Sequence, residues 1–367
     1  MSTPIFRWGI LGTAHIAHKN WQAIRNSGNG VVAAVASREV ERSRRFIAEC
    51  QAAVPFDAEP RALGRYEDLI AAPDIDAVYV PLPTMLRKEW VLRAAAAGKH
   101  VVCEKPCAAS AEDLEEMLAA CRKHQVQFMD GVMFMHSRRL DQVRAALNDS
   151  QRIGPIRRIS LGFCFNAPAE FFTSNIRART DLEPQGCLGD LGWYCLRFTL
   201  WTMNWKMPHA VAGRILSPPA CGPAQAPTEF SAELFFSDGA SAGFYCSFVT
   251  APQEWVKISG TAGYLEMSDF VLPFYGREIE FDTWNHNYQV RVCDFRMDPH
   301  RRSSIVEEHS HGHPNSQESN LFRNFAQQVQ SGQINDAWPD QALKTQILMD
   351  TCLSSARAGG KMMELAT

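Results

Sequence analysis

The first 130 residues alternate short apolar runs with amphipathic stretches, and this order restricts the chain to few folds. Apolar runs occur at Phe6–Leu11, Val31–Ala36, Ala77–Val80 and His100–Cys103, with a weaker one at Val126–Met129. Helical spacing of apolar residues marks the stretches between them: Ile16–Ile24, Glu39–Cys50, Glu89–Ala97 and Ala111–His124. Buried parallel strands that helices cover on both faces show this pattern. The sequence therefore predicts an α/β domain over residues 1–131, a doubly wound parallel sheet of the Rossmann type.

The pattern changes after about residue 130, where alternating segments replace the apolar runs. Helices are predicted at Arg139–Asn148, Leu321–Val329 and Gln341–Ala358, and strands at Ile156–Phe165, Glu229–Phe236, Ala240–Phe248, Val256–Gly260 and Ile279–Trp284. Alternation with short turns is typical of an antiparallel sheet with one apolar face. We expect an α+β domain over residues 132–367 with an open, mainly antiparallel sheet, whose last helix packs back on the first domain. Ser217–Thr228, with four prolines and no charge, is predicted to be a surface loop.

A motif of small residues follows the first apolar run. Aligned with G-x-G-x-x-G, its three positions are Gly12, Ala14 and Ala17. Gly12 permits a tight turn, Ala14 lets a pyrophosphate approach the backbone, and Ala17 lets the helix pack closely on the strand. The motif alone fits a plain strand-to-helix turn equally well, but its place at the start of a βαβ series favours dinucleotide binding. The predicted cofactor contacts here are Gly12, Thr13, Ala14, His15 and Ile16.

The end of the second strand indicates which dinucleotide binds. A free ribose 2′-hydroxyl usually meets Asp or Glu at this position, whereas a 2′-phosphate is met by a small polar residue and an arginine. The sequence has Ser37 and Arg38, with Arg42 as a possible second cation. Solvation of Arg38 at the surface is the alternative. We favour NADP(H) over NAD(H).

Two constellations carry the predicted chemistry. Glu104-Lys105-Pro106 ends an apolar strand, and ligands of open parallel sheets bind outside the carboxyl ends of the strands. Asp190 and Tyr194 share a face if Asp190 begins a helix, and Tyr194 then exchanges a carbinol proton. For each residue taken alone, a structural role is at least as good an interpretation.

Together these motifs resemble the glucose–fructose oxidoreductase/inositol dehydrogenase (Gfo/Idh/MocA) family over essentially the full chain. The matching pieces are Gly9–Ala17, Glu104-Lys105-Pro106, the motif from Gly186 to Tyr194, and Ser354-Ser355-Ala356 in the final helix. Val80-Pro81-Leu82-Pro83-Thr84 and Asn175-Ile176-Arg177 make the chain most similar to the trans-dihydrodiol dehydrogenase-like branch. The resemblance implies that Lys105, Asp190 and Tyr194 form the catalytic group.

The resemblance also implies NAD(P)-dependent chemistry on sugars, cyclic polyols or related diols, and homodimers or higher homo-oligomers joined through the open sheet. Further predicted cofactor contacts are Pro81, Leu82, Thr84, Glu104 and Lys105. Arg87 stands where many members have a histidine, and many have histidine in place of Tyr194. Arg87, His136 and Arg177 are candidate substrate residues. For His136 and Arg177, as for the neighbouring candidate Arg138, a surface or interface role is the alternative.

Composition excludes several other classes of protein. The 37 Lys and Arg residues against 40 Asp and Glu residues argue against binding nucleic acid through phosphate neutralisation. No apolar run approaches the roughly 20 residues of a membrane span, and the N-terminus has no leader pattern. The eleven cysteines show no disulfide framework, which favours a cytoplasmic protein. His309, His311 and His313 could bind a metal, but the polar segment favours a flexible loop, and the mechanism needs no metal.

The sequence therefore predicts an NADP(H)-dependent oxidoreductase that moves a hydride between nicotinamide and a CH–OH or C=O carbon. Two alternatives stay open: a glycosidase of the same family that retains its NAD, and a dinucleotide sensor without catalytic activity.

Overall fold

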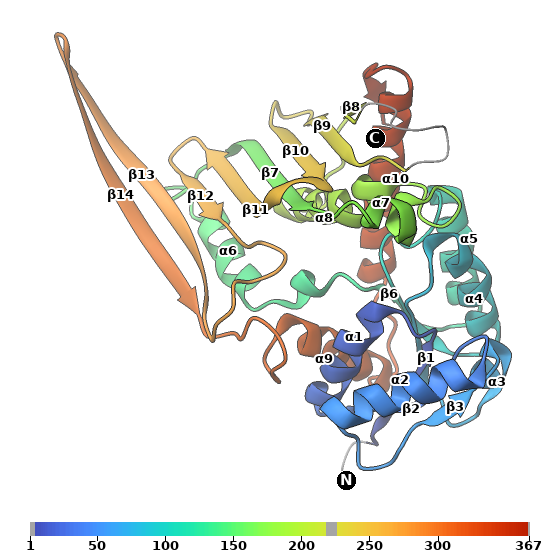
Figure 1. Ribbon diagram of the computed structural model, residues 1–367. Coiled ribbons are helices and arrows are strands. Elements are labelled where there is room, and N and C mark those ends of the chain that lie inside the picture. The colour runs from blue at the N-terminus through green and yellow to red at the C-terminus, as the bar shows by residue number, and fades with distance from the viewer. Residues whose placement is uncertain (1–3, 218–225, 366–367) are drawn as a thin grey trace. The chain divides into compact units, whose positions relative to one another are not determined.

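The computed structural model describes residues 4–217 and 226–365, which form two compact units (Figure 1). Unit 1 comprises Met1–His136, Asp181–Pro184 and His311–Ile347. Unit 2 comprises Ser137–Thr180, Gln185–Ser310 and Leu348–Thr367. The domain boundary after residue 131 stays a prediction. The central part of the predicted loop Ser217–Thr228, residues 218–225, lies outside the described residues.

Unit 1 contains a six-stranded parallel sheet with the order β3-β2-β1-β4-β5-β6. Its strands are β1 (Phe6–Leu11), β2 (Gly30–Ala36), β3 (Arg61–Leu63), β4 (Ala77–Val80), β5 (His100–Cys103) and β6 (Phe128–Asp130). The strand order reverses between β1 and β4, and ligands of such sheets bind at this point, beside the carboxyl ends. The predicted doubly wound domain is confirmed.

Five helices connect these strands: α1 (His15–Ser27), α2 (Val40–Ala53), α3 (Tyr66–Ala71), α4 (Thr84–Ala96) and α5 (Ala111–Lys123). The short 3₁₀ helix η1 (Met133–His136) follows β6. The side chain of Ser110 caps α5 by accepting a hydrogen bond from Asp113 N, as its sequence pattern predicts. A late segment, α9 (Gln317–Gln330), also belongs to this unit. Its Phe322 packs edge-on against Trp8 of β1, with ring centroids 5.1 Å apart.

Unit 2 is built on a nine-stranded sheet with the order β14-β13-β12-β11-β7-β10-β9-β8-β15. Its strands are β7 (Ile156–Asn166), β8 (Ala210–Ile215), β9 (Glu229–Phe235), β10 (Ser241–Ser247), β11 (Val249–Gly260), β12 (Tyr264–Met267), β13 (Ile279–Arg291), β14 (Asp294–Val306) and β15 (Met363–Glu364). Within this sheet β7 and β10 run parallel, and the other neighbouring strands pair antiparallel. The expected mainly antiparallel sheet is confirmed.

The helical elements of unit 2 are α6 (Arg139–Asn148), α7 (Phe171–Ser174), η2 (Ile176–Ala178), the π-helical turn η3 (Leu188–Gly192) and α8 (Trp193–Thr202). Every residue of α8 is buried, so it is a core helix. The long helix α10 (Ala337–Arg357) contributes residues up to Ile347 to unit 1 and its remainder to unit 2. In unit 2 it lies close to β8, since a Cβ atom at Gly213 would come within 2.3 Å of Cys352 O.

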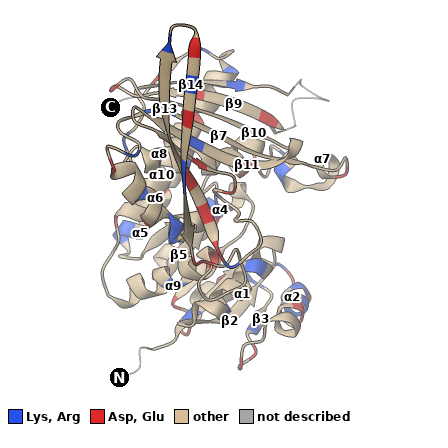
Figure 2. Ribbon diagram, turned by 90° about the vertical axis from the view of Figure 1, so that its left-hand side faces the viewer, with Lys and Arg blue, Asp and Glu red and all other residues tan. Residues whose placement is uncertain are grey.

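The strands β13 and β14 form a hairpin of 13 residues on each side, twice as long as the predicted strand at Ile279–Trp284. Directly paired residues share a face, and the pairs Val290–Phe295 and Tyr288–Met297 place four apolar side chains together near the tip. All four are more than half exposed. Figure 2 shows charged residues along both strands of this hairpin.

A search of the described residues for membrane spans finds no helix that is both long enough and apolar enough to cross a bilayer.

Candidate active site

The predicted dinucleotide loop is the turn between β1 and α1. Gly12 has φ of +109°, and a Cβ atom there would lie 3.0 Å from Leu82 Cδ2, so the turn requires glycine. Ala14 is the N-cap residue of α1; no side chain among the described residues caps it, and the first turn has no acidic residue. The backbone N–H groups at this helix start are therefore available to an anion, which the helix dipole also favours. These residues fit a dinucleotide pyrophosphate.

The turn after β2 presents two cations. Arg38 and Arg42 are exposed, whereas Ser37 is buried and its hydroxyl donates to Glu39 O at 2.5 Å. Burial raises the pKa of Tyr66, while the nearby charges of Arg38 and Arg42 lower it, so this phenol lies close to both arginines. The Tyr66 oxygen is also 4.0 Å from the Cβ position of Gly12. Tyr66 was not predicted as a site residue, because the short helix α3 gives no clear periodic signal in the sequence.

A buried network holds Glu104 at the carboxyl end of β5. Tyr79 Oη donates to Glu104 Oε1 at 2.7 Å, Asn20 Nδ2 donates to the same oxygen at 3.3 Å, and Lys105 N donates to Oε2 at 3.3 Å. Burial, and then the charge of Glu104, raise the pKa of Tyr79 well above its usual range, so the phenol stays a donor. A Cβ atom at Gly131 would lie 3.1 Å from Oε1, so glycine makes room for the carboxylate.

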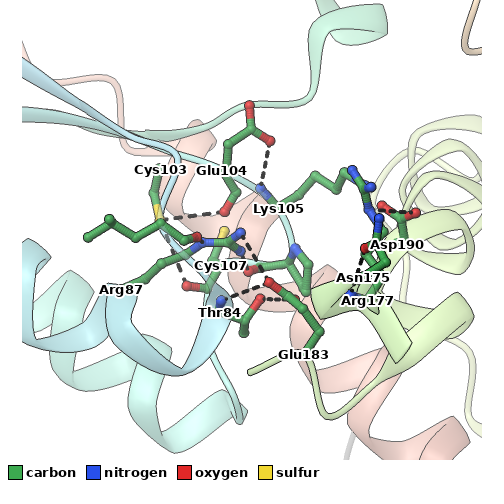
Figure 3. Close-up of polar contacts among 12 residues, drawn as sticks. Thr84, Arg87, Cys103, Glu104, Lys105, Cys107, Asn175, Arg177, Glu183 and Asp190 are labelled. Atoms are coloured by element: carbon green, nitrogen blue, oxygen red, sulfur yellow. Dashed lines mark hydrogen bonds and ion pairs between the residues drawn. The ribbon is translucent and has the colours of Figure 1, made fainter. Parts of the chain in front are cut away.

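This network fixes the backbone from which the Lys105 side chain leaves. Lys105 itself is half-buried, and its peptide bond to Pro106 is cis. The bond from Lys105 N to the Glu104 carboxylate can be followed in Figure 3. A side chain that positions a reacting oxygen needs a backbone held in place in this way.

Arg87 joins three segments of unit 1 around this turn (Figure 3). It is 5% exposed; its Nε donates to Leu82 O at 2.7 Å, and its Nη1 donates to Pro106 O. Its Nη2 lies 3.9 Å from Glu183 Oε1, and Glu183 also accepts from Thr84 N at 3.0 Å and from Thr84 Oγ1 at 2.5 Å. Contacts of Arg87 with substrate and of Thr84 with cofactor stay predictions. Glu183 was missed, since it is 99 residues from Thr84 and belongs to no local motif.

The second pair of predicted site residues, Asp190 and Tyr194, lies in unit 2, where a π-helical turn precedes the α-helix. Leu188–Gly192 forms a π-helical turn, and the α-helix begins only at Trp193. A π-helix bonds residue i to i+5, so the α-helical spacing rule does not by itself apply from Asp190 to Tyr194. Gly186 permits the approach to this turn: it has φ of +52°, and a Cβ atom there would lie 2.3 Å from Pro227 O. π-helical turns are frequent at functional sites.

Two predicted site residues of unit 2 form an ion pair. Arg177 Nε lies 3.1 Å from Asp190 Oδ2, with the side chains 45% and 15% exposed (Figure 3). Asn175 Oδ1 accepts from Arg177 N at 3.0 Å and so shapes the segment that carries this arginine. Tyr194 is the second residue of α8. It is 8% exposed, and the centroid of its ring lies 5.7 Å from that of Phe163 on β7.

The other predicted residues have the following places. Thr13, His15 and Ile16 lie on the β1–α1 turn and the start of α1, and Pro81 is buried directly after β4. His136 lies among helices of unit 1: Asn324 Nδ2 is 3.1 Å from its Nδ1, and its ring lies 6.1 Å from that of Trp338. The structure thus brings the β1–α1 turn and Leu82 together in unit 1, and Arg177 and Asp190 together in unit 2. The roles assigned to these residues stay predictions.

Histidine and cysteine are the side chains most often found in metal sites of the zinc type. Across residues 4–217 and 226–365, no group of three or more His, Cys, Asp or Glu side chains is arranged to hold a metal ion. His309, His311 and His313 lie in a segment outside helices and strands. The cysteines within the described ranges are free thiols, and all except Cys293 are buried.

Two family models match the chain. Residues 6–132 match the oxidoreductase family with an NAD-binding Rossmann fold, and residues 141–266 match the GFO/IDH/MocA C-terminal domain. The first model covers the β1–α1 turn and the Lys105 motif, and the second covers Asp190 and Tyr194.

Individual proteins are similar to the chain over different lengths. D-xylose 1-dehydrogenase (NADP(+)) 2 of Haloferax volcanii is 32% identical over 71% of this chain and 74% of its own length. Trans-1,2-dihydrobenzene-1,2-diol dehydrogenase of Xenopus laevis is 30% identical over 57% of this chain and 60% of its own length. A 3-ketoreductase from Actinomadura kijaniata, solved in complex with NADP and TDP-benzene, is 25% identical with a TM-score of 0.80, covering 96% of this chain and 98% of that one.

Proposed function

Since the chain belongs to the Gfo/Idh/MocA family of NAD(P)-dependent oxidoreductases, we propose that it uses NADP(H) to interconvert a carbinol and a carbonyl on a sugar, cyclic polyol or dihydrodiol-like substrate. The preference for NADP(H) rests on the turn after β2. Two exposed arginines, Arg38 and Arg42, are placed there beside Tyr66, and no carboxylate stands at Ser37 to accept a ribose hydroxyl.

In the proposed mechanism, Lys105, Asp190 and Tyr194 each have a separate role. When bound, NADP(H) supplies or accepts the hydride. Tyr194 exchanges the proton of the reacting oxygen, because a phenol can both donate and accept at that atom. The Lys105 ammonium and the Asp190 side chain hold the same oxygen, and Arg177 positions Asp190 through their ion pair. The proposal requires Lys105 and Tyr194 to face one nicotinamide ring.

The observation that carries this proposal is the hydrogen-bond network that holds the Lys105 backbone in place. This backbone is held by the buried Glu104–Tyr79–Asn20 network at the carboxyl end of β5, an interior strand of the parallel sheet. Such strand ends are where doubly wound sheets bind their ligands. A lysine that is only solvated would not need its backbone held by a buried polar network, whereas a catalytic lysine would.

We also propose a homodimer or higher homo-oligomer through the open sheet of unit 2. The free, buried thiols further suit a reducing compartment such as the cytoplasm, where we place the enzyme.

The experiment combines cofactor titration with turnover. Fluorescence titration with NADPH and NADH should show tighter binding of NADPH, and a panel of sugars, ketoses, inositols and dihydrodiols should reveal turnover by nicotinamide absorbance. Lys105→Met should then lower kcat by about 10²- to 10⁴-fold and leave the Kd for NADPH nearly unchanged. Lys123→Met, at the exposed end of α5, is the matched control.

Three outcomes contradict the proposal. Undiminished turnover by the Lys105 variant removes its catalytic role. A tightly held cofactor that does not exchange indicates the NAD-retaining glycosidase instead. Binding of NADPH with no turnover across the panel indicates a dinucleotide sensor.

A further inference from the structure

The β12–β13 loop of unit 2, residues 268–278, exposes apolar side chains from an anchored backbone. Leu272, Phe274 and Tyr275 are 45%, 66% and 92% exposed. Their neighbours Phe270 and Val271 are buried. Exposed apolar patches often mark interaction sites, and binding residues are frequently found on loops that a rigid scaffold positions.

A buried ion pair fixes the first part of this loop. Arg139 Nη1 contacts Asp269 Oδ1 at 2.5 Å, and Arg139 Nη2 donates to Asp269 O at 2.6 Å. Both side chains are almost fully buried. The second oxygen of the same carboxylate, Asp269 Oδ2, accepts from Phe274 N at 3.0 Å. One carboxylate therefore sets the backbone of an exposed aromatic residue.

Two further anchors hold the rest of the loop. Glu254 Oε2 accepts from Val271 N at 3.1 Å and from Leu272 N at 2.8 Å. At the far side, Gly276 N donates to Ser310 Oγ at 3.3 Å, and Ser310 N donates to Gly276 O at 3.1 Å. The exposed side chains are thus presented on a pre-organised backbone, which lowers the entropic cost of binding a ligand.

Aromatic packing connects this loop with Tyr194 inside the same unit. The ring of Phe270 lies 5.3 Å from that of Phe198 on α8 and 6.3 Å from that of Phe163 on β7. Phe163 in turn lies 5.7 Å from Tyr194. A single side chain therefore separates the root of the loop from the proposed proton-exchanging phenol.

From this arrangement, and resting on the proposed function, we propose that Leu272, Phe274 and Tyr275 form the apolar wall of the substrate site and bind the C–H face of a six-membered ring. A pyranose and a cyclic diol share this chemistry: each presents ring C–H groups beside its hydroxyls. An aromatic wall contacts those C–H groups and leaves the hydroxyls to polar residues. The wall then favours cyclic over acyclic polyols.

The test measures binding rather than turnover, so it stays informative if no turnover is found. Saturation-transfer NMR on the NADPH complex uses three probes that NADPH cannot reduce: methyl β-D-xylopyranoside, trans-1,2-cyclohexanediol and glycerol. The double variant Phe274→Ala/Tyr275→Ala should weaken binding of both ring probes by about 10-fold and leave NADPH affinity unchanged. Loss for only one ring probe identifies which ring class the wall accepts.

Two controls accompany the double variant. Tyr275→Phe keeps the ring and should bind like the wild type, and Met362→Ala removes another exposed apolar side chain, elsewhere in unit 2. Unchanged binding of both ring probes by the double variant overturns the proposal, and so does an equal loss of glycerol binding. A wild-type oligomer that the double variant dissociates would identify the loop as a subunit interface instead. Failure of the proposed redox function appears separately, as absence of turnover by the wild type.

Discussion

Tyr79 is the residue whose buried hydroxyl most directly supports the proposed catalytic lysine. Its Oη donates to Glu104, which in turn accepts from the backbone N of Lys105. We assign Tyr79 no contact with the substrate or the cofactor. It acts through Glu104, and we therefore regard it as a positioning residue.

Tyr79→Phe removes this donor and leaves the Glu104 oxygen with the longer bond from Asn20. A buried carboxylate that loses a partner costs about 1–3 kcal/mol of folding free energy. We expect kcat to fall by about 10-fold because Lys105 is held less firmly, with the Kd for NADPH unchanged. Steady-state kinetics and NADPH titration check this result, with Tyr288→Phe on the exposed hairpin as the matched control. A kcat equal to that of the wild type contradicts the positioning role.

Single residues differ in how far the sequence predicts them. Gly12 and Lys105 stand at fixed points of a strand–turn–helix pattern, so their places follow from local order. Asn20 and Glu183 act through partners 84 and 99 residues away, and no periodic signal connects such pairs. The residues that hold the predicted site in place are therefore visible only in the tertiary structure.

Among the elements, buried strands were predicted well and exposed ones poorly. β1, β4 and β5 match their predicted bounds because burial on both faces makes them continuous apolar runs. β14 was missed because it alternates charged with apolar residues around Pro299 and lies in a hairpin that is exposed on both faces. The condition that Asp190 begins a helix is not met, since Asp190 lies inside the π-helical turn Leu188–Gly192.

Glu254, a buried carboxylate on β11 that accepts hydrogen bonds from the β12–β13 loop, is expected to make the stability of the fold depend on pH. Burial raises the pKa of Glu254 from 4.5 to about 7; nearby Asp269 raises it further, and Arg139 opposes the shift. Because the folded-state pKa lies above the unfolded one, Glu254 stabilises the fold fully below about pH 4.5, and this contribution is lost as pH rises through 7.

Glu254→Gln should remove this dependence, because the amide oxygen still accepts from Val271 N and Leu272 N without titrating. Between about pH 5 and about pH 8, the unfolding free energy of the wild type should fall relative to the variant by at most about 3 kcal/mol. Urea unfolding of both proteins across this range measures the difference. A difference that does not change with pH contradicts the assignment.

At the scale of the whole molecule, the β13–β14 hairpin exposes an apolar face that no other part of the described chain covers. The β13–β14 hairpin carries Tyr288, Val290, Phe295 and Met297 on one face near its tip, all more than half exposed. Isolated two-stranded hairpins are marginally stable, and exposed apolar faces of this kind are usually covered. This hairpin is an edge of the sheet through which we propose that subunits associate.

Val290→Glu/Phe295→Glu should therefore weaken self-association. Sedimentation equilibrium is expected to show a dimer or larger assembly for the wild type and a shift toward monomer for this variant. Asn287→Glu/Gln289→Glu adds the same charge to the opposite, polar face of the hairpin and should associate like the wild type. A monomeric wild type removes the basis of the prediction.

The central claim concerns two groups in different units: that the Lys105 ammonium and the Tyr194 phenol act on one substrate oxygen above a single nicotinamide. A crystal structure of the chain with NADP⁺ and a bound polyol measures this directly. We expect Lys105 Nζ and Tyr194 Oη to lie within about 3 Å of one substrate oxygen, on the same face of the nicotinamide ring. A structure in which the two groups line separate cavities would contradict it.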